Sequence, residues 1–449
     1  MSMKRIMILL GVWLLTATSC DYLNVKPIGK VIPEKSSEFR ALLTSAYSTF
    51  PTHKKLLALR SDELFPMLYT PTYSSYIDLA LLKDAGADSD TYTYPWQDLY
   101  KVIFYANSVI EGVTDAVEDG ISDSREQLKG EAFLLRAYTH FELLNLYAKP
   151  YSATSAGEDR GIPLALEIDV DKVYMPESVE KVYTQILQDI THALELLDVE
   201  EQPAETRYRF SRKSALALLT RVRLYHEEWD LAQAVAEELL PSCPLEDLNE
   251  GEQAKLPYLY DSKEAILAME LTCGTDLVDD ATVLPNLSEK YNADGDLRLR
   301  RWFRNAYGEY RADKCYDKSM RVTFRSAEIY LIAAEAAAHR EGQLPQAKSY
   351  LKQLMEKRLT SAYYAEKAIE VDAMNQEQLL AEIADERARE LALEGHRWYD
   401  LRRTTRPRIV KSYMDMNFEM QELVIEQNDS RYVIPFPQEA TENNPNLRN

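Results

Sequence analysis

Apolar and small residues recur at helical spacing along most of this sequence. The clearest stripe runs through residues 386–403 and includes Ala388, Leu391, Gly395 and Trp398. Acidic and basic residues fill the other positions at separations that allow pairing. The pattern predicts one continuous buried helix, in which Trp398 and its neighbour belong to the core. Since a glycine inside a helix costs about 1 kcal/mol relative to alanine, we expect another group to approach Gly395 closely.

The same period predicts four helices in the first half of the chain. They cover about 37–50, 96–113, 127–148 and 176–197, and the last begins near Ser178. The third is apolar around most of its circumference, as is typical of a central helix.

Two further segments, 211–240 and 326–358, each contain an Ala- and Leu-rich helix, a short polar turn and a second helix. They resemble tetratricopeptide (TPR) repeats, and 127–197 is a looser copy with an insertion. Stacked hairpins of this kind form one continuous unit. We therefore predict an all-α fold with a single domain over 37–449. Two irregular loop regions, 60–95 and 241–320, interrupt it.

The N-terminal residues carry the features of an export signal. Lys4 and Arg5 precede an apolar run over 6–15 that is too short to span a bilayer, and small residues lead to Cys20. This ending resembles the lipobox of bacterial lipoproteins, although Ala17 stands where Leu or Val is usual. We expect a signal peptide over 1–19 and a lipidated Cys20 with an extended tether over 20–36; the alternative is a plain signal peptide.

The net charge argues against a nucleic acid partner, and the cysteine spacing argues against a metal site. The sequence has 73 Asp and Glu against 52 Lys and Arg, and a surface this acidic repels phosphate backbones, so we expect no nucleic acid partner. Cys243, Cys273 and Cys315 are widely spaced and show no metal-ligand pattern. We predict no metal or cofactor, and at most one disulfide, whose presence the sequence leaves open.

The two irregular regions contain aromatic residues that could bind a sugar. Sugar rings pack their C–H faces on aromatic side chains, and such contacts are usually made by exposed loops. The candidates are Tyr69, Tyr73, Tyr76, Trp302, Tyr307 and Tyr310. The alternative is that these rings, like most of the 29 tyrosines, fill seams between helices.

Catalytic and calcium-binding patterns are weak. Asp62 and Glu63 could form a glycosidase pair, but adjacent side chains usually point apart. No nucleophile-elbow, zinc-protease or phosphate-loop motif occurs, so we predict no enzymatic activity. Asn292, Asp294 and Asp296 begin like a calcium loop, but its twelfth position is Phe303, and we interpret this stretch as a surface turn.

Several stretches together resemble the SusD/RagB family of surface lipoproteins. They are the lipoprotein start, the helix from residue 96, GEAFLLRAY at 130–138, AEIYLIAAEA at 327–336, RELALEGHRWYDLRR at 389–403, and the closing IPFPQEATENNPNL at 434–447. The resemblance implies a SusD-like helical scaffold with TPR-like hairpins. It also implies an outer-membrane lipid anchor facing the cell exterior, and partnership with a SusC-like TonB-dependent transporter.

From this resemblance we expect a non-enzymatic protein that binds nutrients, above all oligosaccharides, and delivers them to the transporter. The chain is short for the family, which implies trimmed ligand-binding insertions and leaves the glycan open. The alternative is an outer-membrane scaffold or adaptor, or a peptide binder, acting through the TPR-like surface. Exposed and convergent loop aromatics would favour a glycan, and packed ones a protein contact.

Overall fold

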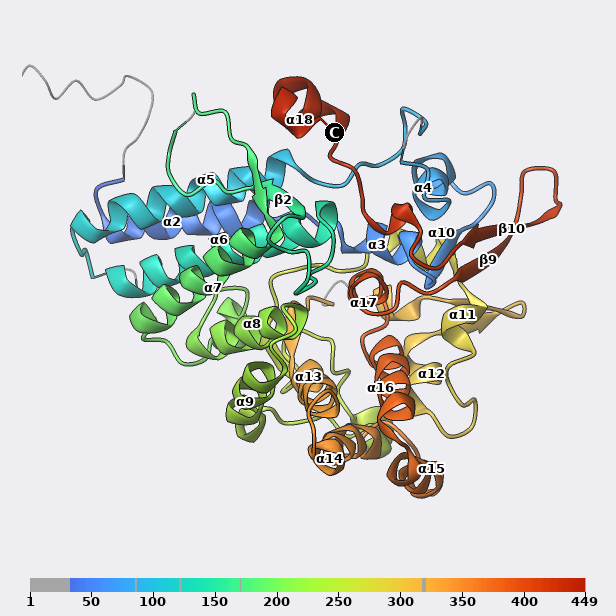
Figure 1. Cartoon of the computed structure of the whole chain (residues 1–449). Coiled ribbons are helices and arrows are strands. Elements are labelled where there is room, and N and C mark those ends of the chain that lie inside the picture. Colours follow the sequence, from blue (N-terminus) through green and yellow to red (C-terminus); the bar gives the residue numbers. More distant parts are fainter. Residues whose placement is uncertain (1–32, 85–86, 121–122, 170, 317–319, 449) are drawn as a thin grey trace, which may run out of the picture.

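The structure, a computed structural model, describes residues 33–84, 87–120, 123–169, 171–316 and 320–448 (Figure 1). The predicted signal peptide, Cys20 and all but the last four residues of the tether lie outside these ranges.

Paired helices form most of the molecule, as predicted. The bounds are α2 (Ser36–Thr49), α5 (Gln97–Gly112), α6 (Arg125–Tyr147), α7 (Val179–Leu196), α8 (Arg212–Tyr225), α9 (Trp229–Leu239), α13 (Ser326–Ala338) and α14 (Leu344–Glu356). In Figure 1, α2, α5 and α6 lie toward the top of this group, α7 and α8 lie below them, and α9, α13 and α14 lie toward the bottom of the molecule. The all-α prediction and the TPR-like hairpins α6–α7, α8–α9 and α13–α14 are confirmed.

The sequence specifies these helices by caps and by small residues. The Ser124 side chain accepts a hydrogen bond from the main-chain N–H of Gln127 at the start of α6, and Ser178 caps α7 in the same way. Ala333 and Ala337 on α13 are fully buried, and α13 packs against both α9 and α14. Small side chains on α13 permit this close approach on two sides.

The predicted continuous helix over 386–403 is wrong. Helix α16 (Gln376–Glu390) stops, residues 391–395 form a turn, and α17 (Arg397–Arg403) begins afresh. Gly395 has φ +81°, and a Cβ there would lie 2.4 Å from Cδ of Lys54. The predicted close approach to Gly395 is therefore confirmed, and the approaching group is the Lys54 side chain.

The irregular regions contain short elements that the pattern did not predict. In 60–95 these are the end of α3 (Lys54–Arg60), β1 (Leu64–Pro66) and α4 (Tyr73–Ala80). The later elements are β4 (Ala265–Leu267), α10 (Asp276–Asp280), β5 (Ala281–Val283), α11 (Pro285–Ser288), α12 (Leu297–Trp302), β6 (Arg304–Ala306), β7 (Glu309–Arg311) and β8 (Phe324–Arg325). The remaining elements are β2 (Arg160–Pro163), β3 (Pro176–Ser178), α15 (Ser361–Ala373), β9 (Ile409–Met414), β10 (Met420–Ile425) and α18 (Gln438–Asn443).

All strands of the described residues form antiparallel two-stranded pairs, β1–β5, β2–β3, β4–β8, β6–β7 and β9–β10. In the β1–β5 pair, Phe65 lies opposite Thr282, which joins the two irregular regions across more than 200 residues of sequence. In the part of the chain that the structure describes, we find no helix with the length and apolar character needed to cross a membrane.

A buried ionic network supports α16 and the turn that follows it. Arg298, Arg325 and Arg358 are each no more than 1% exposed, and all three bond to Glu390. Further carboxylates come from Glu264, Asp296, Glu386 and Glu394. Because each buried guanidinium has several carboxylate or carbonyl partners, the network fixes the helix end and the turn in place.

Candidate functional site

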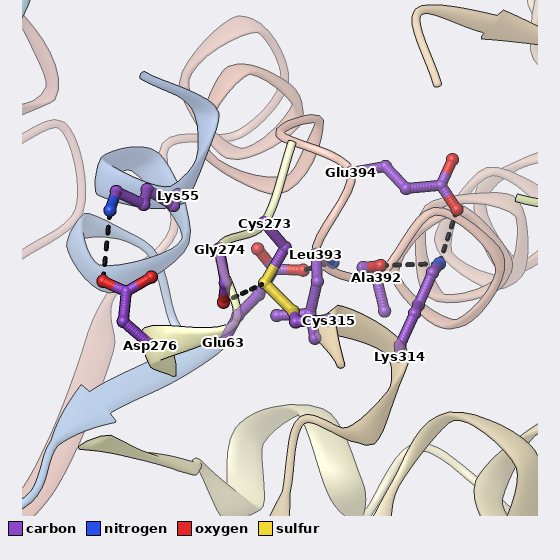
Figure 2. Close-up of a disulfide and its surroundings, with 10 residues drawn as sticks. All are labelled: Lys55, Glu63, Cys273, Gly274, Asp276, Lys314, Cys315, Ala392, Leu393 and Glu394. Carbon is purple, nitrogen blue, oxygen red and sulfur yellow. Dashed lines mark hydrogen bonds and ion pairs between the residues drawn. A yellow bond between two sulfur atoms is a disulfide. The ribbon is translucent and has the colours of Figure 1, made fainter. Parts of the chain in front are cut away.

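The turn over 391–395 holds two distant loops. The main-chain N–H of Leu393 donates a hydrogen bond to Glu63 Oε1 at 2.8 Å, which fixes the segment before β1. Lys314 donates to Ala392 O at 2.8 Å and to Glu394 Oε1 at 2.5 Å, which fixes the segment after β7 (Figure 2). One turn therefore positions both irregular regions that carry the candidate aromatic residues.

A disulfide between Cys273 and Cys315 joins two parts of the later region, 241–320, and Cys243 is buried and free. Figure 2 shows the disulfide between the Lys55–Asp276 ion pair on one side and the Lys314–Glu394 pair on the other. The sequence had left open whether any disulfide forms.

The predicted aromatic candidates divide into three groups. Tyr69 is 65% exposed and Tyr307 is fully exposed, whereas Tyr73 and Tyr310 are half-buried. Tyr76 and Trp302 are completely buried, so the expectation that they are exposed loop residues is wrong.

The two buried rings have specific partners in the core. The Tyr76 hydroxyl donates to Asp276, and burial together with this acceptor raises the pKa of Tyr76. Trp302 packs edge-on against Tyr258, and Lys314 Nζ lies 4.1 Å from the centroid of the Trp302 ring. Both side chains therefore belong to the core and not to the exposed surface.

The structure adds three exposed aromatic residues that sequence reasoning missed, Tyr92, Tyr316 and Phe418. Phe418 lies 5.8 Å from Tyr69 between ring centroids, and Tyr92 packs 5.2 Å from Tyr76. Tyr316 directly follows the disulfide-bonded Cys315. The segments DTYTYPW (90–96) and MDMNFEM (414–420) were a usable signal, because they interleave aromatic or methionine residues with polar ones.

These aromatic residues belong to segments that are linked by contacts, and we call the group the tyrosine face: Tyr69, Tyr73, Tyr92, Tyr307, Tyr310, Tyr316 and Phe418. Met67 N–H donates to Asp280 O at 2.8 Å, and Thr282 Oγ1 lies 3.5 Å from Tyr310 O, so β1, β5 and β7 are neighbours. Arg304 pairs with Asp313 and Asp279, which links β6 to the disulfide loop and α10. Figure 1 shows α4, α10 and the β9–β10 hairpin grouped on this side of the molecule.

Three aromatic residues of this face have a left-handed backbone. The φ angles are +62° for Tyr69, +57° for Tyr307 and +63° for Phe418, and all three side chains are largely exposed. This conformation is unfavourable for a bulky L-residue and costs about 1–2 kcal/mol. In the β6–β7 hairpin, Tyr307 and Gly308 form a two-residue loop with positive φ at both positions, where Asn-Gly would be the favoured pair.

Charged groups surround the rings. Lys55 Nζ lies 5.6 Å from the centroid of Tyr92 and 5.5 Å from that of Tyr76, and pairs with Asp276 at 3.1 Å. Burial raises the pKa of Asp276, but hydrogen bonds from Tyr76 and Lys55 outweigh it and hold the pKa below its usual value. Asp276 therefore carries a negative charge beside the rings.

The other sequence candidates have structural partners. Asp62 receives two hydrogen bonds from Arg397, and Glu63 binds the Leu393 N–H, so the two carboxylates serve different contacts. Asn292 Oδ1 accepts from Gly295 N–H in a turn whose residues 292–294 are exposed, as the surface-turn interpretation predicted, whereas Asp296 is buried against Arg298. Among the described residues, no group of three or more His, Cys, Asp or Glu side chains gathers in a way that could hold a metal.

Two family models and a curated relative match this chain. Residues 21–224 match a SusD-like family model described as starch-binding and associating with the outer membrane, and residues 270–449 match the SusD family model. A SusD-like protein of Formosa agariphila is 24% identical over 397 residues, covering 71% of this chain and 73% of that protein.

Solved structures share the fold. A SusD superfamily protein from Bacteroides fragilis has a TM-score of 0.75 and 20% identity, covering 93% of this chain and all of that one. A SusD-like carbohydrate-binding protein from Bacteroides vulgatus has a TM-score of 0.69 and 19% identity over 92% of this chain and 97% of its own. A laminarin-binding SusD-like protein has a TM-score of 0.62 and 19% identity, with 83% and 92% covered. The two family models, which cover most of the chain from residue 21 to its end, together with the shared fold, identify this chain as a member of the SusD/RagB family.

Proposed function

We propose that this protein captures oligosaccharides at the cell surface, without catalysis, and delivers them to a SusC-like TonB-dependent transporter. The tyrosine face is the ligand-binding surface. Relatives described as carbohydrate-binding and laminarin-binding have the same fold, which supports the assignment to a glycan.

The observation that supports this proposal most strongly is that Tyr69, Tyr307 and Phe418 are largely exposed although each has an unfavourable left-handed backbone. In the free protein, burial of the side chains does not compensate this backbone strain, because all three side chains are largely exposed. Backbone strain retained at exposed positions is characteristic of functional sites. Flat rings offer the C–H faces of sugars an apolar platform, and neighbouring carboxylates accept hydrogen bonds from sugar hydroxyls.

A binding screen tests this function. The anchor-free protein beginning after Cys20 is titrated calorimetrically with a panel of oligosaccharides and peptides, and then repeated with Tyr69→Ala and Tyr307→Ala. Tyr364→Ala is the matched control, since this half-buried tyrosine lies on α15, away from the face (Figure 1). We expect saturable glycan binding that both face variants weaken at least about tenfold and the control leaves intact.

Two results would contradict the proposal. Absence of binding to every glycan would remove the capture function, and preferential binding of peptides would favour the adaptor or peptide-binding alternative. Glycan binding that survives both face variants would place the site elsewhere.

The anchor and the transporter partner are tested separately with the full-length chain. We expect Cys20→Ser to move the protein from the outer-membrane fraction to the soluble fraction, since acyl chains hold a protein on the membrane without a spanning helix. We expect the wild-type protein to co-purify with a TonB-dependent transporter from membranes in mild detergent. If the wild-type protein is purified from these membranes without a TonB-dependent transporter, the result would contradict the delivery role.

A further inference from the structure

The charges around the tyrosine face restrict the kind of glycan that it can bind. The face is built from residues 64–84, 87–92, 273–316 and 409–425, and these segments contain fifteen Asp and Glu against nine Lys and Arg. Some of these charges are buried, but eight of the Asp and Glu are exposed against three of the Lys and Arg, so the surface is acidic before any pairing is considered.

The cations of the described residues in these segments are already engaged. Arg304 pairs with Asp313 at 3.0 Å and lies 3.9 Å from Asp279, while Arg311 pairs with Glu309 at 3.1 Å. The others pair with carboxylates or donate to main-chain carbonyls: Lys83, Lys290, Arg298, Arg300, Arg301, Lys314 and Lys411. Lys55, which borders the face from α3, pairs with Asp276.

Several carboxylates of the face are open to solvent, including Asp279 and Glu309, which contact Arg304 and Arg311. The side chain of Asp279 is 82% exposed and that of Glu309 is 57% exposed, and Asp88, Asp90 and Glu419 are also exposed. Ionised carboxylates accept hydrogen bonds and cannot donate them, so they suit the hydroxyl donors of an uncharged sugar and repel a uronate or a sulfate.

From this arrangement we propose that the tyrosine face selects neutral, hydroxyl-rich oligosaccharides and rejects glycans that carry carboxylate or sulfate groups. This inference rests on the proposed glycan-binding function. An anionic sugar would compete with the existing carboxylate or carbonyl partner of each cation and would meet the negative field of the face. A neutral sugar meets neither obstacle, because ring stacking and hydroxyl-to-carboxylate bonds need no free cation.

The test compares matched neutral and anionic ligands on the same backbone. Calorimetry of the anchor-free protein with laminarin and sulfated laminarin, and with starch and carboxymethyl starch, is run at about 0.02 M and about 0.3 M NaCl. Alginate and polygalacturonate complete the panel as naturally anionic glycans. We expect a neutral member to bind at least about tenfold more tightly than its anionic counterpart at low salt, with a smaller difference at high salt.

A double charge reversal separates local from total charge. Asp279→Lys with Glu309→Lys changes two exposed side chains of the face, and Glu238→Lys with Glu366→Lys makes the same change in net charge on α9 and α15, away from it. We expect the face variant to raise the affinity for the anionic ligand about tenfold and the control to leave it within about twofold.

The outcomes distinguish the inference from the function beneath it. Tighter binding of an anionic glycan by the wild-type protein would overturn the selection for neutral ligands and leave the capture function standing. An equal change in the affinity for the anionic ligand in both double variants would also overturn the selection for neutral ligands and leave the capture function standing. No binding of any glycan would overturn both.

Discussion

The main-chain N–H of Leu393 donates a 2.8 Å hydrogen bond to the carboxylate of Glu63, a residue 330 positions earlier in the sequence. Both residues are buried, and Leu393 has a left-handed backbone with φ +63°. The strained turn thus points a donor at the segment that leads into β1. Since Lys314 is bound from the same turn, one structural feature organises both loops of the tyrosine face.

Glu63 makes the stability of the protein depend on pH. Burial raises its pKa to about 7, although the Leu393 N–H opposes the rise. Because the folded state binds this proton more tightly than the unfolded state, stability falls as pH rises from about 4.5 to about 7, by roughly 3 kcal/mol at most. We expect Glu63→Gln to remove this part of the dependence in urea unfolding followed between pH 5 and 8. An unchanged slope would contradict the assignment, and exposed Glu366→Gln is the control.

Gly395 is required by both its backbone and its neighbour. Gly395→Ala would place a Cβ against the Lys54 side chain and strain a φ of +81°. We expect it to lower the free energy of unfolding by about 2–4 kcal/mol. Gly342→Ala is the matched control, since its φ is +74° and nothing lies within 4 Å, and should cost about 1 kcal/mol. Equal losses of unfolding free energy in the two variants would show that the Lys54 side chain can move away from the added Cβ without an energetic cost.

The Cys273–Cys315 disulfide should stabilise both the fold and the face. It closes a separation of 42 residues, for which loop entropy predicts about 2–4 kcal/mol. We expect Cys315→Ser to lower the thermal midpoint and to weaken glycan binding, because Asp276 and Tyr316 are held by the two ends of the bridge. Cys243→Ser, at the free buried cysteine, should lower stability without weakening binding. If thiol titration of the anchor-free wild-type protein, unfolded without reductant, detects two free thiols in addition to Cys243, the bridge is absent.

The ionic network under α16 should be costly to interrupt. Arg358→Met removes a guanidinium that is fully buried against Glu264 and Glu390, so two buried carboxylates lose a partner. We expect a loss of about 3–5 kcal/mol by urea unfolding. The control is Lys181→Met, whose pair with Glu177 is exposed and should contribute less than about 0.5 kcal/mol. A loss similar to the control would mean that the neighbouring guanidinium groups compensate.

Strain relief separates stability from function on the tyrosine face. Tyr307→Gly removes a ring from a left-handed position, so we expect a gain of about 1 kcal/mol in stability together with weaker glycan binding. Glu227→Gly relieves a similar φ of +58° in the exposed turn between α8 and α9 and should stabilise the protein with no change in binding. A variant at Tyr307 that binds normally would remove this residue from the site.

The candidate site was only partly predictable from sequence. Both aromatic loops were identified, and Tyr69 and Tyr307 are exposed as expected. Tyr76 and Trp302 were misassigned, because a loop position does not reveal whether a ring faces solvent or the core. Phe418 was missed because its hairpin joins the face through tertiary packing against Tyr69.

The sequence by itself determined the helical hairpins, their caps and the family, since hydrophobic period, capping serines and local motifs act within a few residues. The tertiary structure alone decided the break before Gly395, the Cys273–Cys315 bridge and the convergence of the tyrosine face. Each depends on groups that are distant in sequence: the Lys54 side chain closes on Gly395, and Glu63 and Lys314 meet the same turn. Local periodicity contains no information about such partners, because they become neighbours only when the chain has folded.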